Sequence, residues 1–374
     1  MKELDFDDLG LSPEIMDALK KMDVTRPTTV QQLAIPILMK DECLIAKAPT
    51  GTGKTFAFAI PILEYLDLDN KDIQALILCP TRELALQIAS EIKGLSRFIK
   101  GVNVCAVIGG QSMKLQAERI NKHPQIVVAT PGRLLDLYER RIIDIRKIYT
   151  LILDEADEML KMGFINSIKE VMRITPRDKQ IALFSATMPR EVMNITWSFM
   201  QGAKEIDVMP KAEDRPKIDE YTIEVSQKDK SRVIVDLIRS NGFTKTIVFC
   251  NTKRQTEIVY KSFSASGLTC GCLQGNMGQG ARNRVMDAFR HEKFEVLVAT
   301  DVVARGIDVD DVDAVFNYDI PTDNEFYLHR IGRTARAGKT GKAYSLVSFT
   351  DRERMEEIIR YTGASPKPME IPKK

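Results

Sequence analysis

The chain has 374 residues, of which 44% are hydrophobic and 28% charged, so it can bury a core and is not disordered along its length. Its 54 Lys and Arg against 52 Asp and Glu give a formal net charge of +2, which excludes binding of polyanions through bulk charge alone. No apolar run approaches the length of a membrane span, so no membrane partner is expected. Six cysteines in a chain of this length predict reduced thiols and a cytoplasmic protein.

The first part of the chain alternates short apolar runs with helical patterns. The runs are continuous and rich in Ile, Val and Leu, as expected of strands buried on both faces of a parallel sheet. They lie at 43–48, 75–79, 102–108, 125–129, 149–153 and 180–184. This alternation predicts an α/β domain over residues 1–208, with helices on both faces of its sheet.

A charged stretch with two prolines interrupts this rhythm. It reads VMPKAEDRPKIDE over 208–220 and has neither a helical nor a strand period, so we predict a linker over 209–218. A second α/β domain is then predicted over 219–374, with residues 365–374 as a tail. Its apolar runs lie at 221–225, 246–250, 295–299, 313–319 and 343–349.

The run at 43–48 leads into a glycine-rich loop and then into a helical pattern. The loop reads APTGTGKT and differs from the usual phosphate-loop pattern only at its first position, Ala48. Gly51 and Gly53 would let successive N–H groups face a polyphosphate at the N-terminus of the helix. Lys54 is then placed to reach the β and γ phosphates, and the Thr55 hydroxyl to hold Mg²⁺.

A cluster of carboxylates follows the run at 149–153. It reads Asp-Glu-Ala-Asp, at the strand end where ligands of open α/β sheets gather. Asp154 is suited to hold the water shell of Mg²⁺, and Glu155 to orient and deprotonate a water that attacks the γ-phosphate. Asp157 is better placed to fasten a neighbouring segment, for which SAT at 185–187 is the natural partner.

Together with further motifs, these residues resemble the DEAD-box RNA helicases. The motifs stand in the order of that family: RPTTVQ with Gln31, APTGTGKT, PTRELA (80–85), Gly109-Gly110, TPGR (130–133), DEAD (154–157), SAT (185–187), ATDVVARGIDV (299–309) and HRIGRTAR (329–336). The resemblance covers about residues 6–350. It implies two tandem RecA-like domains, each a mostly parallel sheet with helices on both faces, with ATP and RNA bound in the cleft between them.

The resemblance implies a set of nucleotide and catalytic residues. Gln31 would read adenine, since one amide can donate to N7 and accept from N6. If their segment is helical, Arg333 and Arg336 would share a face and act as arginine fingers. The implied nucleotide-binding residues are Phe6, Pro27, Gln31, Pro49, Thr50, Gly51, Thr52, Gly53, Lys54, Thr55, Gly306, Asp308, Arg333 and Arg336. The implied catalytic residues are Lys54, Asp154, Glu155, Arg333 and Arg336, with Thr55 and Asp154 holding the Mg²⁺.

The resemblance also implies contacts to the RNA backbone, which carry no base identity, so binding independent of sequence is expected. These residues are Pro80, Thr81, Arg82, Gly110, Thr130, Gly132, Arg133, Thr252, Gln279, Arg282 and Thr300. The residues that the resemblance implies for coupling between the domains are Asp157, Ser185, Thr187, Arg305 and His329.

Two departures from the family pattern bear on these roles. Asp23-Val24 stands where Gly-Phe is usual, so a purine that would pack on an aromatic ring meets only a valine. Ala335 stands where glycine is usual, and a methyl group in a helix would cost little.

The resemblance implies an ATP-dependent RNA helicase, in which ATP and RNA close the two domains and locally separate short duplexes without processive movement. An alternative is an ATP-gated RNA clamp that hydrolyses slowly and serves as a platform for ribonucleoprotein partners. A third reading is a DNA helicase or translocase, which equal stimulation by DNA and RNA would favour. The default oligomeric state is a monomer, and the physiological RNA is left open.

Overall fold

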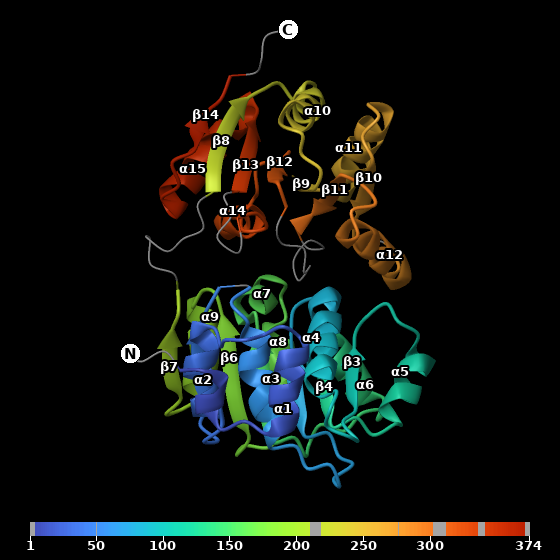
Figure 1. Cartoon of the computed structure of the whole chain (residues 1–374), viewed down its shortest axis with the longest axis vertical. Helices are drawn as coiled ribbons and strands as arrows, with labels where there is room; N and C mark the ends of the chain where they lie inside the picture. Colours follow the sequence, from blue (N-terminus) through green and yellow to red (C-terminus); the bar gives the residue numbers. More distant parts are fainter. Residues whose placement is uncertain are drawn as a thin grey trace. The chain divides into compact units, whose positions relative to one another are not determined.

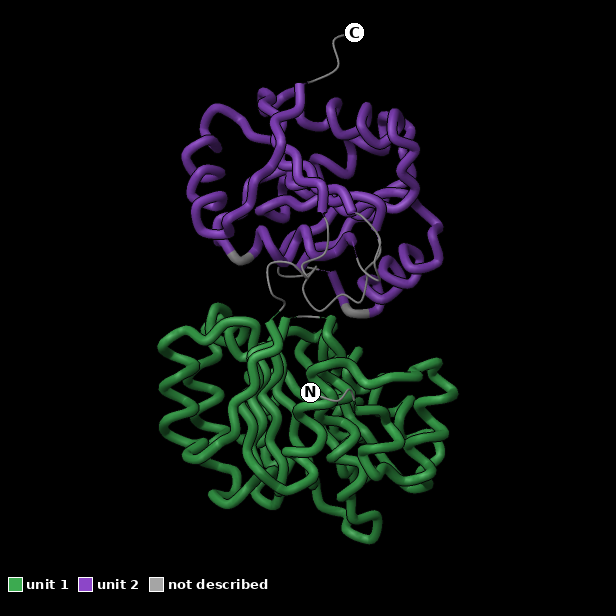
Figure 2. Tube along the Cα trace, turned by 60° about the vertical axis from the view of Figure 1, so that its left-hand side comes forward, with its two compact units in different colours: residues 1–210 green, residues 211–374 purple. Residues whose placement is uncertain are grey.

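The structure is a computed structural model that describes residues 4–49, 51–209, 218–275, 277–301, 312–335 and 341–370. The chain divides into two compact units, Met1–Pro210 (unit 1) and Lys211–Lys374 (unit 2), coloured separately in Figure 2. The linker predicted over 209–218 lies outside the described residues except at its ends, and Ile218 is already the first residue of a strand.

Unit 1 contains a seven-stranded sheet in the order β3-β4-β2-β5-β6-β1-β7, and every described pair of neighbours is parallel. All six strands predicted for this unit are present, while the edge strand β7 was not predicted. The strands are β1 (Leu44–Lys47), β2 (Ala75–Leu78), β3 (Val104–Val107), β4 (Ile126–Ala129), β5 (Thr150–Asp154), β6 (Gln180–Ser185) and β7 (Lys204–Asp207).

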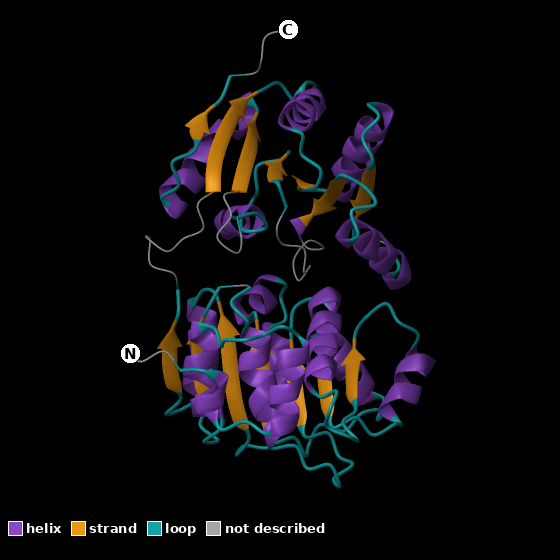
Figure 3. Ribbon diagram, in the orientation of Figure 1, coloured by secondary structure: helices purple, strands orange, loops and turns teal. Residues whose placement is uncertain are grey.

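Helices cover both faces of this sheet (Figures 1 and 3), because neighbouring strand residues point to opposite sides. Ala75 and Ile77 of β2 join one core with α1 to α4, and Leu76 and Leu78 join the other with α6 to α9. The helices are α1 (Pro13–Lys21), α2 (Thr29–Leu38), α3 (Lys54–Glu64), α4 (Arg82–Leu95), α5 (Met113–Ile120), α6 (Pro131–Glu139), α7 (Ala156–Lys161), α8 (Ile165–Ile174) and α9 (Arg190–Phe199), preceded by a short 3-10 helix, η1 (Phe6–Leu9).

Unit 2 repeats this topology, with parallel neighbours in the order β10-β11-β9-β12-β13-β8-β14. Its strands are β8 (Ile218–Glu224), β9 (Thr246–Cys250), β10 (Cys270–Leu273), β11 (Val296–Thr300), β12 (Ala314–Asn317), β13 (Gly341–Val347) and β14 (Lys367–Pro368). Its described helices are α10 (Lys230–Asn241), α11 (Lys253–Ala265), α12 (Gln279–Arg290), α14 (Asn324–Ile331), α15 (Arg352–Thr362) and the 3-10 helix η3 (Phe349–Asp351).

The five predicted strands of unit 2 are confirmed, whereas the two edge strands β10 and β14 were missed. The predicted tail is therefore only partly correct, since Lys367 and Pro368 pair with Tyr221 and Thr222 of β8. A lysine followed by a proline does not predict a strand, so the pairing is visible only from the neighbouring strand. Among the described residues, no helix is both long and apolar enough to cross a bilayer.

Candidate functional site

The predicted motifs of unit 1 follow the carboxyl ends of its strands. The phosphate loop follows β1, Thr81 follows β2, Thr130 follows β4, Glu155 follows β5, and Ala186 follows β6. Since the strands are parallel, these segments all lie along one edge of the sheet, the edge at which open α/β sheets bind ligands.

The phosphate loop joins β1 to α3 and requires two left-handed residues. Gly51 and Gly53 have φ angles of 77° and 84°, and Gly53 is the N-cap of α3. Within the loop the Thr52 hydroxyl donates to the carbonyl of Pro49, at 2.9 Å. Thr55 lies half-buried in the first turn of α3. The N-terminus of α3 thus faces the ligand edge, as an anion site requires. Thr50 lies outside the described residues.

Lys54 is the first residue of α3, and only 6% of its surface is exposed. Its Nζ lies 3.4 Å from the carbonyl oxygen of Ala48 and 3.8 Å from Oδ1 of Asp154, so the ammonium is held loosely. Burial raises the pKa of the Asp154 carboxyl, and the neighbouring Lys54 opposes that shift. A cation and a carboxylate thus face each other beside a helix N-terminus, an arrangement that suits a phosphate with its Mg²⁺.

Glu155 is the N-cap of α7 and has a φ angle of 51°. A left-handed conformation is uncommon for glutamate, and such strain is concentrated at functional sites. The Glu155 N–H donates to Oδ1 of Asp154, at 3.0 Å, and the residue is 7% exposed. The turn therefore holds the two carboxylates next to each other at the end of β5.

Asp157 joins the DEAD segment to the SAT segment. Its carboxylate accepts hydrogen bonds from the N–H and the hydroxyl of Thr187, at 2.9 and 2.8 Å, and its own N–H donates to Oγ of Ser185. The carbonyl of Ser185 in turn accepts from the N–H of Ala48, at 2.9 Å. The SAT segment therefore contacts both the carboxylate turn and the phosphate loop.

Gln31 is buried against the phosphate loop, with both ends of its amide engaged. Nε2 donates to the carbonyl of Gly53, and Oε1 accepts from the N–H of Thr28, each at 3.0 Å. A Cβ on Gly53 would lie 2.5 Å from Nε2, so only glycine permits this approach. One N–H and one lone pair of the amide are left for a base. The contact with Thr28 was not predicted, although Thr and Gln at this spacing form a capping box.

Phe6 and Pro27, which were expected to line the nucleotide site near Gln31, are both buried. Phe6 is 2% exposed and belongs to the first core of unit 1. Pro27 is buried and its carbonyl accepts from Nε2 of Gln32. Asp23 has a φ angle of 56°, and Val24 packs against the core. Asp23 therefore adopts the left-handed conformation that the glycine usual in the family takes without cost.

Arg133 lies in a network that sequence reasoning missed in part. It donates to Oε1 of Gln116 at 3.0 Å, to the carbonyl of Gln111 at 2.5 Å, and to Asp136 at 3.1 Å. Gln116 is fully buried, and its Nε2 donates to the carbonyl of Ile108, at 2.6 Å. Gln116 thus ties the TPGR segment to the Gly109-Gly110 turn, a role that nothing in its local sequence reveals.

Arg82 packs on the Gly109-Gly110 turn. A Cβ on Gly109 would lie 3.0 Å from Nη2 of Arg82, and one on Gly110 would clash with Nη1. Gly110 also has a φ angle of 78°. The two glycines therefore leave room for the guanidinium of a predicted RNA-binding residue.

Threonines begin helices at this edge in both units. The Oγ1 of Thr81 accepts from the N–H of Leu84 at 3.2 Å, and that of Thr252 in unit 2 accepts from Gln255 at 3.1 Å. Thr130 is the N-cap of α6. Each helix N-terminus presents N–H groups at which RNA phosphates would be favourable.

The other RNA-binding candidates lie near these helix ends. Pro80 is buried before Thr81, and Gly132 is exposed in the first turn of α6. In unit 2, Thr300 ends β11 and Arg282 is buried in the first turn of α12. Gln279 begins α12, but its side chain lies outside the described residues.

The final motif differs from its expected helical form. His329 belongs to α14, but this helix ends at Ile331, so Arg333 does not lie on it. Arg333 is 8% exposed and its Nε donates to the carbonyl of His329, at 3.4 Å. Ala335 has a φ angle of 62°, so the expectation of a methyl group in a helix was wrong. The predicted site residues Arg305, Gly306, Asp308 and Arg336 lie outside the described residues.

Arg330 has a structural role that the motif alone did not predict. Its side chain is 1% exposed and forms a bidentate ion pair with Asp301, with Nε 2.6 Å from Oδ1 and Nη2 2.7 Å from Oδ2. It also donates to Oδ1 of Asn251 and to the carbonyl of Asp319, and it lies over the ring of Phe249. One guanidinium therefore joins the segments that follow three neighbouring strands of unit 2.

Comparisons with known families and proteins agree with the geometry. Residues 28–195 match the family model of the DEAD/DEAH box helicases, and residues 229–338 match the helicase conserved C-terminal domain. The chain is 39% identical over 367 residues to the DEAD-box ATP-dependent RNA helicase CshA of Geobacillus kaustophilus, across 98% of this chain and 78% of that protein. It is 40% identical over 370 residues to the ATP-dependent RNA helicase DeaD of Escherichia coli K12, across 99% of this chain and 59% of that protein.

Solved structures of similar proteins include nucleotide and RNA complexes. S. cerevisiae Dbp5 bound to RNA and ADP BeF3 is 31% identical, with a TM-score of 0.87 across 98% of this chain and 96% of that one. Mss116p bound to ssRNA and AMP-PNP is 29% identical, with a TM-score of 0.88 across 100% of this chain and 80% of that one.

Proposed function

The chain belongs to the DEAD-box ATP-dependent RNA helicases, and from this premise we propose how its own residues couple ATP hydrolysis to RNA strand separation. The observation that carries the proposal is the edge of unit 1, where the loosely held Lys54, the helix N-terminus of α3 and the strained Asp154-Glu155 turn lie together.

Lys54, Thr55 and Asp154 would hold the nucleotide and its metal. Among the described residues, Lys54 has two long contacts, at 3.4 Å to the Ala48 carbonyl and 3.8 Å to Asp154, and we propose that its ammonium binds the β and γ phosphates. Mg²⁺ binds through one or two protein oxygens together with substrate phosphates, and the Thr55 hydroxyl and the Asp154 carboxylate suit that need. The metal would neutralise charge on the transferred phosphoryl group.

Glu155 would orient and deprotonate the attacking water. Glu155 directly follows Asp154 in a left-handed turn. The Asp154 carboxylate would therefore bind the metal, and the Glu155 carboxylate would contact the water. The remaining amide N–H and lone pair of Gln31 would read adenine, and the buried Phe6 would support the segment that carries Gln31.

RNA would bind through its phosphates at Thr81, Arg82, Gly110 and Arg133 of unit 1, and at Thr252, Arg282 and Thr300 of unit 2. The N–H groups at the starts of α4 and α11 favour phosphate oxygens, and such contacts carry no base identity. We therefore expect RNA binding that is independent of sequence.

Closure of the two units would link these activities. The nucleotide residues named above lie mainly in unit 1, and Arg333 with Arg336 lies in unit 2, so hydrolysis would require both units together. RNA held by both units would follow a path that a regular duplex does not fit, so that closure separates a short duplex locally. Asp157, Ser185, Thr187, Arg305 and His329 would transmit the state of the nucleotide.

Steady-state ATPase activity with and without single-stranded RNA, with matched DNA as a control, tests this proposal. We expect strong stimulation by RNA and little by DNA. Glu155→Gln should lower kcat about 10²–10⁴-fold while ATP and RNA still bind, and should abolish turnover in a strand-separation assay. Hydrolysis at the wild-type rate in this variant would refute the role of Glu155.

Weak stimulation combined with long-lived, ATP-dependent RNA binding would instead favour a clamp that recruits ribonucleoprotein partners. Equal stimulation by DNA and RNA would favour a translocase that does not discriminate the 2′-hydroxyl. We further propose that the protein acts as a monomer. We also propose that it lies in the cytoplasm, because all six cysteines are free thiols and a reducing compartment keeps thiols in this state.

A further inference from the structure

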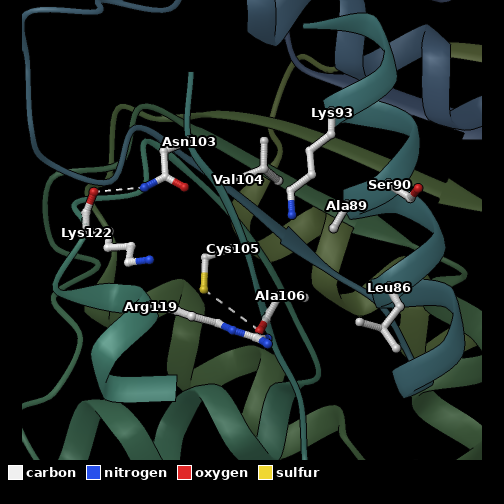
Figure 4. A pocket seen from close by; sticks show the side chains of 10 residues that line it. All are labelled: Leu86, Ala89, Ser90, Lys93, Asn103, Val104, Cys105, Ala106, Arg119 and Lys122. Carbon is white, nitrogen blue, oxygen red and sulfur yellow. Dashed lines mark hydrogen bonds between the residues drawn. The ribbon is translucent and has the colours of Figure 1, made fainter. Parts of the chain in front are cut away.

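A pocket of about 400 Å³ lies at the β3 edge of the sheet of unit 1, between α4 and the end of α5. Its floor is formed by Val104, Cys105 and Ala106 of β3, and one wall by Leu86, Ala89 and Ser90 of α4 (Figure 4). This volume is in the range of sites for small ligands.

Three cations and no carboxylate line this pocket. Lys93 approaches from α4, and Arg119 and Lys122 from α5 and the turn after it, on the other side of Cys105 (Figure 4). None of the three forms an ion pair with a residue in the part of the chain that the structure describes, although Arg119 donates to Oε1 of Gln111 at 3.3 Å. Among the described residues, their charge is therefore not balanced by an ion pair.

Two further observations show that the pocket is electropositive and held in shape. Burial raises the pKa of the Cys105 thiol, while Arg119 and Lys93 act in the opposite direction, so both cations act on the floor of the pocket. Nδ2 of Asn103 donates to the carbonyl of Lys122, at 2.8 Å, and so fastens the end of α5 to the start of β3.

The Lys93 side of the pocket lies far from Arg82, whereas Arg119 contacts Gln111, whose carbonyl accepts from the predicted RNA-binding residue Arg133. Arg82 begins α4, whereas Lys93 lies in its last turn, about 16 Å further along the helix axis. Lys93 and Arg119 each suit the C-terminal end of their own helix. The helix-end effect explains Lys93 and Arg119 separately, but it does not explain why three cations line one pocket that has no carboxylate among its lining residues.

We propose that this pocket binds a phosphate-bearing small molecule. The Ser90 hydroxyl would donate alongside the three cations, while Leu86 and Ala89 would contact an apolar part of the ligand. Lys93, Arg119 and Lys122 are themselves exposed, so the site is a shallow one for a ligand in free exchange with solvent. A doubly charged phosphate gains more from three cations than a singly charged anion does.

Amide NMR spectra of the full chain, titrated with inorganic phosphate and with ribose 5-phosphate at constant ionic strength, test the proposal. We expect saturable shifts at Ser90, Val104 and Ala106, and separately at Gly51 and Gly53 of the phosphate loop. Affinity for ribose 5-phosphate well above that for inorganic phosphate would identify an organic phosphate as the ligand. Equal affinities would identify free phosphate.

A matched pair of variants separates the pocket from general charge. Lys93→Glu with Lys122→Glu should weaken binding at the pocket about tenfold or more and leave the response of the phosphate loop unchanged. Lys100→Glu with Lys114→Glu makes the same change in net charge at exposed positions outside the pocket, and should leave both responses unchanged.

Shifts confined to the phosphate loop, or an equal loss of affinity in both double variants, would overturn the proposal. The three cations would then serve only to keep an edge strand from pairing with other chains. Because the phosphate loop reports in the same spectra, failure at the pocket is distinguishable from failure of the proposed nucleotide site.

Discussion

Unit 1 and unit 2 have the same strand order, but the lysines at one equivalent position differ in how closely other groups contact them. β1 and β8 occupy the same place in their sheets, and each leads into a helix that begins with lysine, Lys54 in α3 and Lys230 in α10. Lys230 Nζ donates to the carbonyl of Tyr318 at 2.8 Å and pairs with Asp351 at 3.1 Å. The contacts of Lys54 with described residues are longer, at 3.4 Å to the Ala48 carbonyl and 3.8 Å to Asp154.

The loops before these lysines explain the difference. Gly51 and Gly53 adopt left-handed conformations in the loop before α3, whereas residues 225–229 contain no glycine. In unit 2 the ammonium of Lys230 is instead engaged by the Tyr318 carbonyl and the Asp351 carboxylate. The same fold position can stabilise a domain or bind a ligand, depending on whether the lysine is already satisfied.

Within this comparison, the largest expected effect comes from removing the loosely held Lys54. Lys54→Ala should lower kcat for ATP hydrolysis by about 10²–10³-fold, because a cation aimed at the transferred phosphoryl group is lost. Hydrogen exchange at the amides of unit 2 should not change. Activity near the wild-type level would show that the contrast between the two lysines has no functional meaning.

The satisfied lysine should behave in the opposite way. Lys230→Ala leaves Asp351 and the carbonyl of Tyr318 without their cation, so unit 2 should lose about 3 kcal/mol of unfolding free energy. Hydrogen exchange at β12 and β13 would report the loss, while ATP affinity of the folded protein should be retained. Lys228→Ala, at an exposed position on the preceding loop, is the matched control.

Gln116 extends the comparison to the segments that carry predicted RNA-binding residues. Gln116→Leu removes the partner of the Ile108 carbonyl and of the Arg133 Nε, at a cost of about 1–3 kcal/mol. The RNA concentration for half-maximal ATPase should rise several-fold, with kcat at saturating RNA unchanged. Lys114→Ala on the same helix should change neither. A fall in kcat alone would contradict a positioning role for Gln116.

The smallest expected effect concerns Ala335, a left-handed residue of unit 2. Ala335→Gly should raise the free energy of unfolding of unit 2 by about 0.5–1 kcal/mol, because relief of the left-handed strain exceeds the added chain entropy. Ala281→Gly in α12 should lower it by about 1 kcal/mol. Urea unfolding followed by a probe in unit 2 measures both. Destabilisation by Ala335→Gly would show that its conformation carries no strain.

Local sequence determined the buried strands and the chemistry at their ends. Runs such as 75–79 and 246–250 are apolar without alternation because both faces of each strand are covered, and this pattern is visible without any partner. The glycines, Lys54 and the carboxylates follow such runs directly, so their place at the ligand edge of the sheet could be predicted from sequence.

Only the tertiary structure decided which groups form hydrogen bonds and ion pairs with the buried polar side chains. The partners of Gln116, Lys230 and Arg330 lie 8 to 121 residues away in sequence, and no local pattern encodes contacts over such separations. Among the edge strands, β3 has a continuous apolar run and was predicted, whereas β7 (KEID), β10 (CGCL) and β14 (KP) have no such run and were missed. The left-handed Ala335 likewise depends on where α14 ends, which packing decides rather than helix propensity.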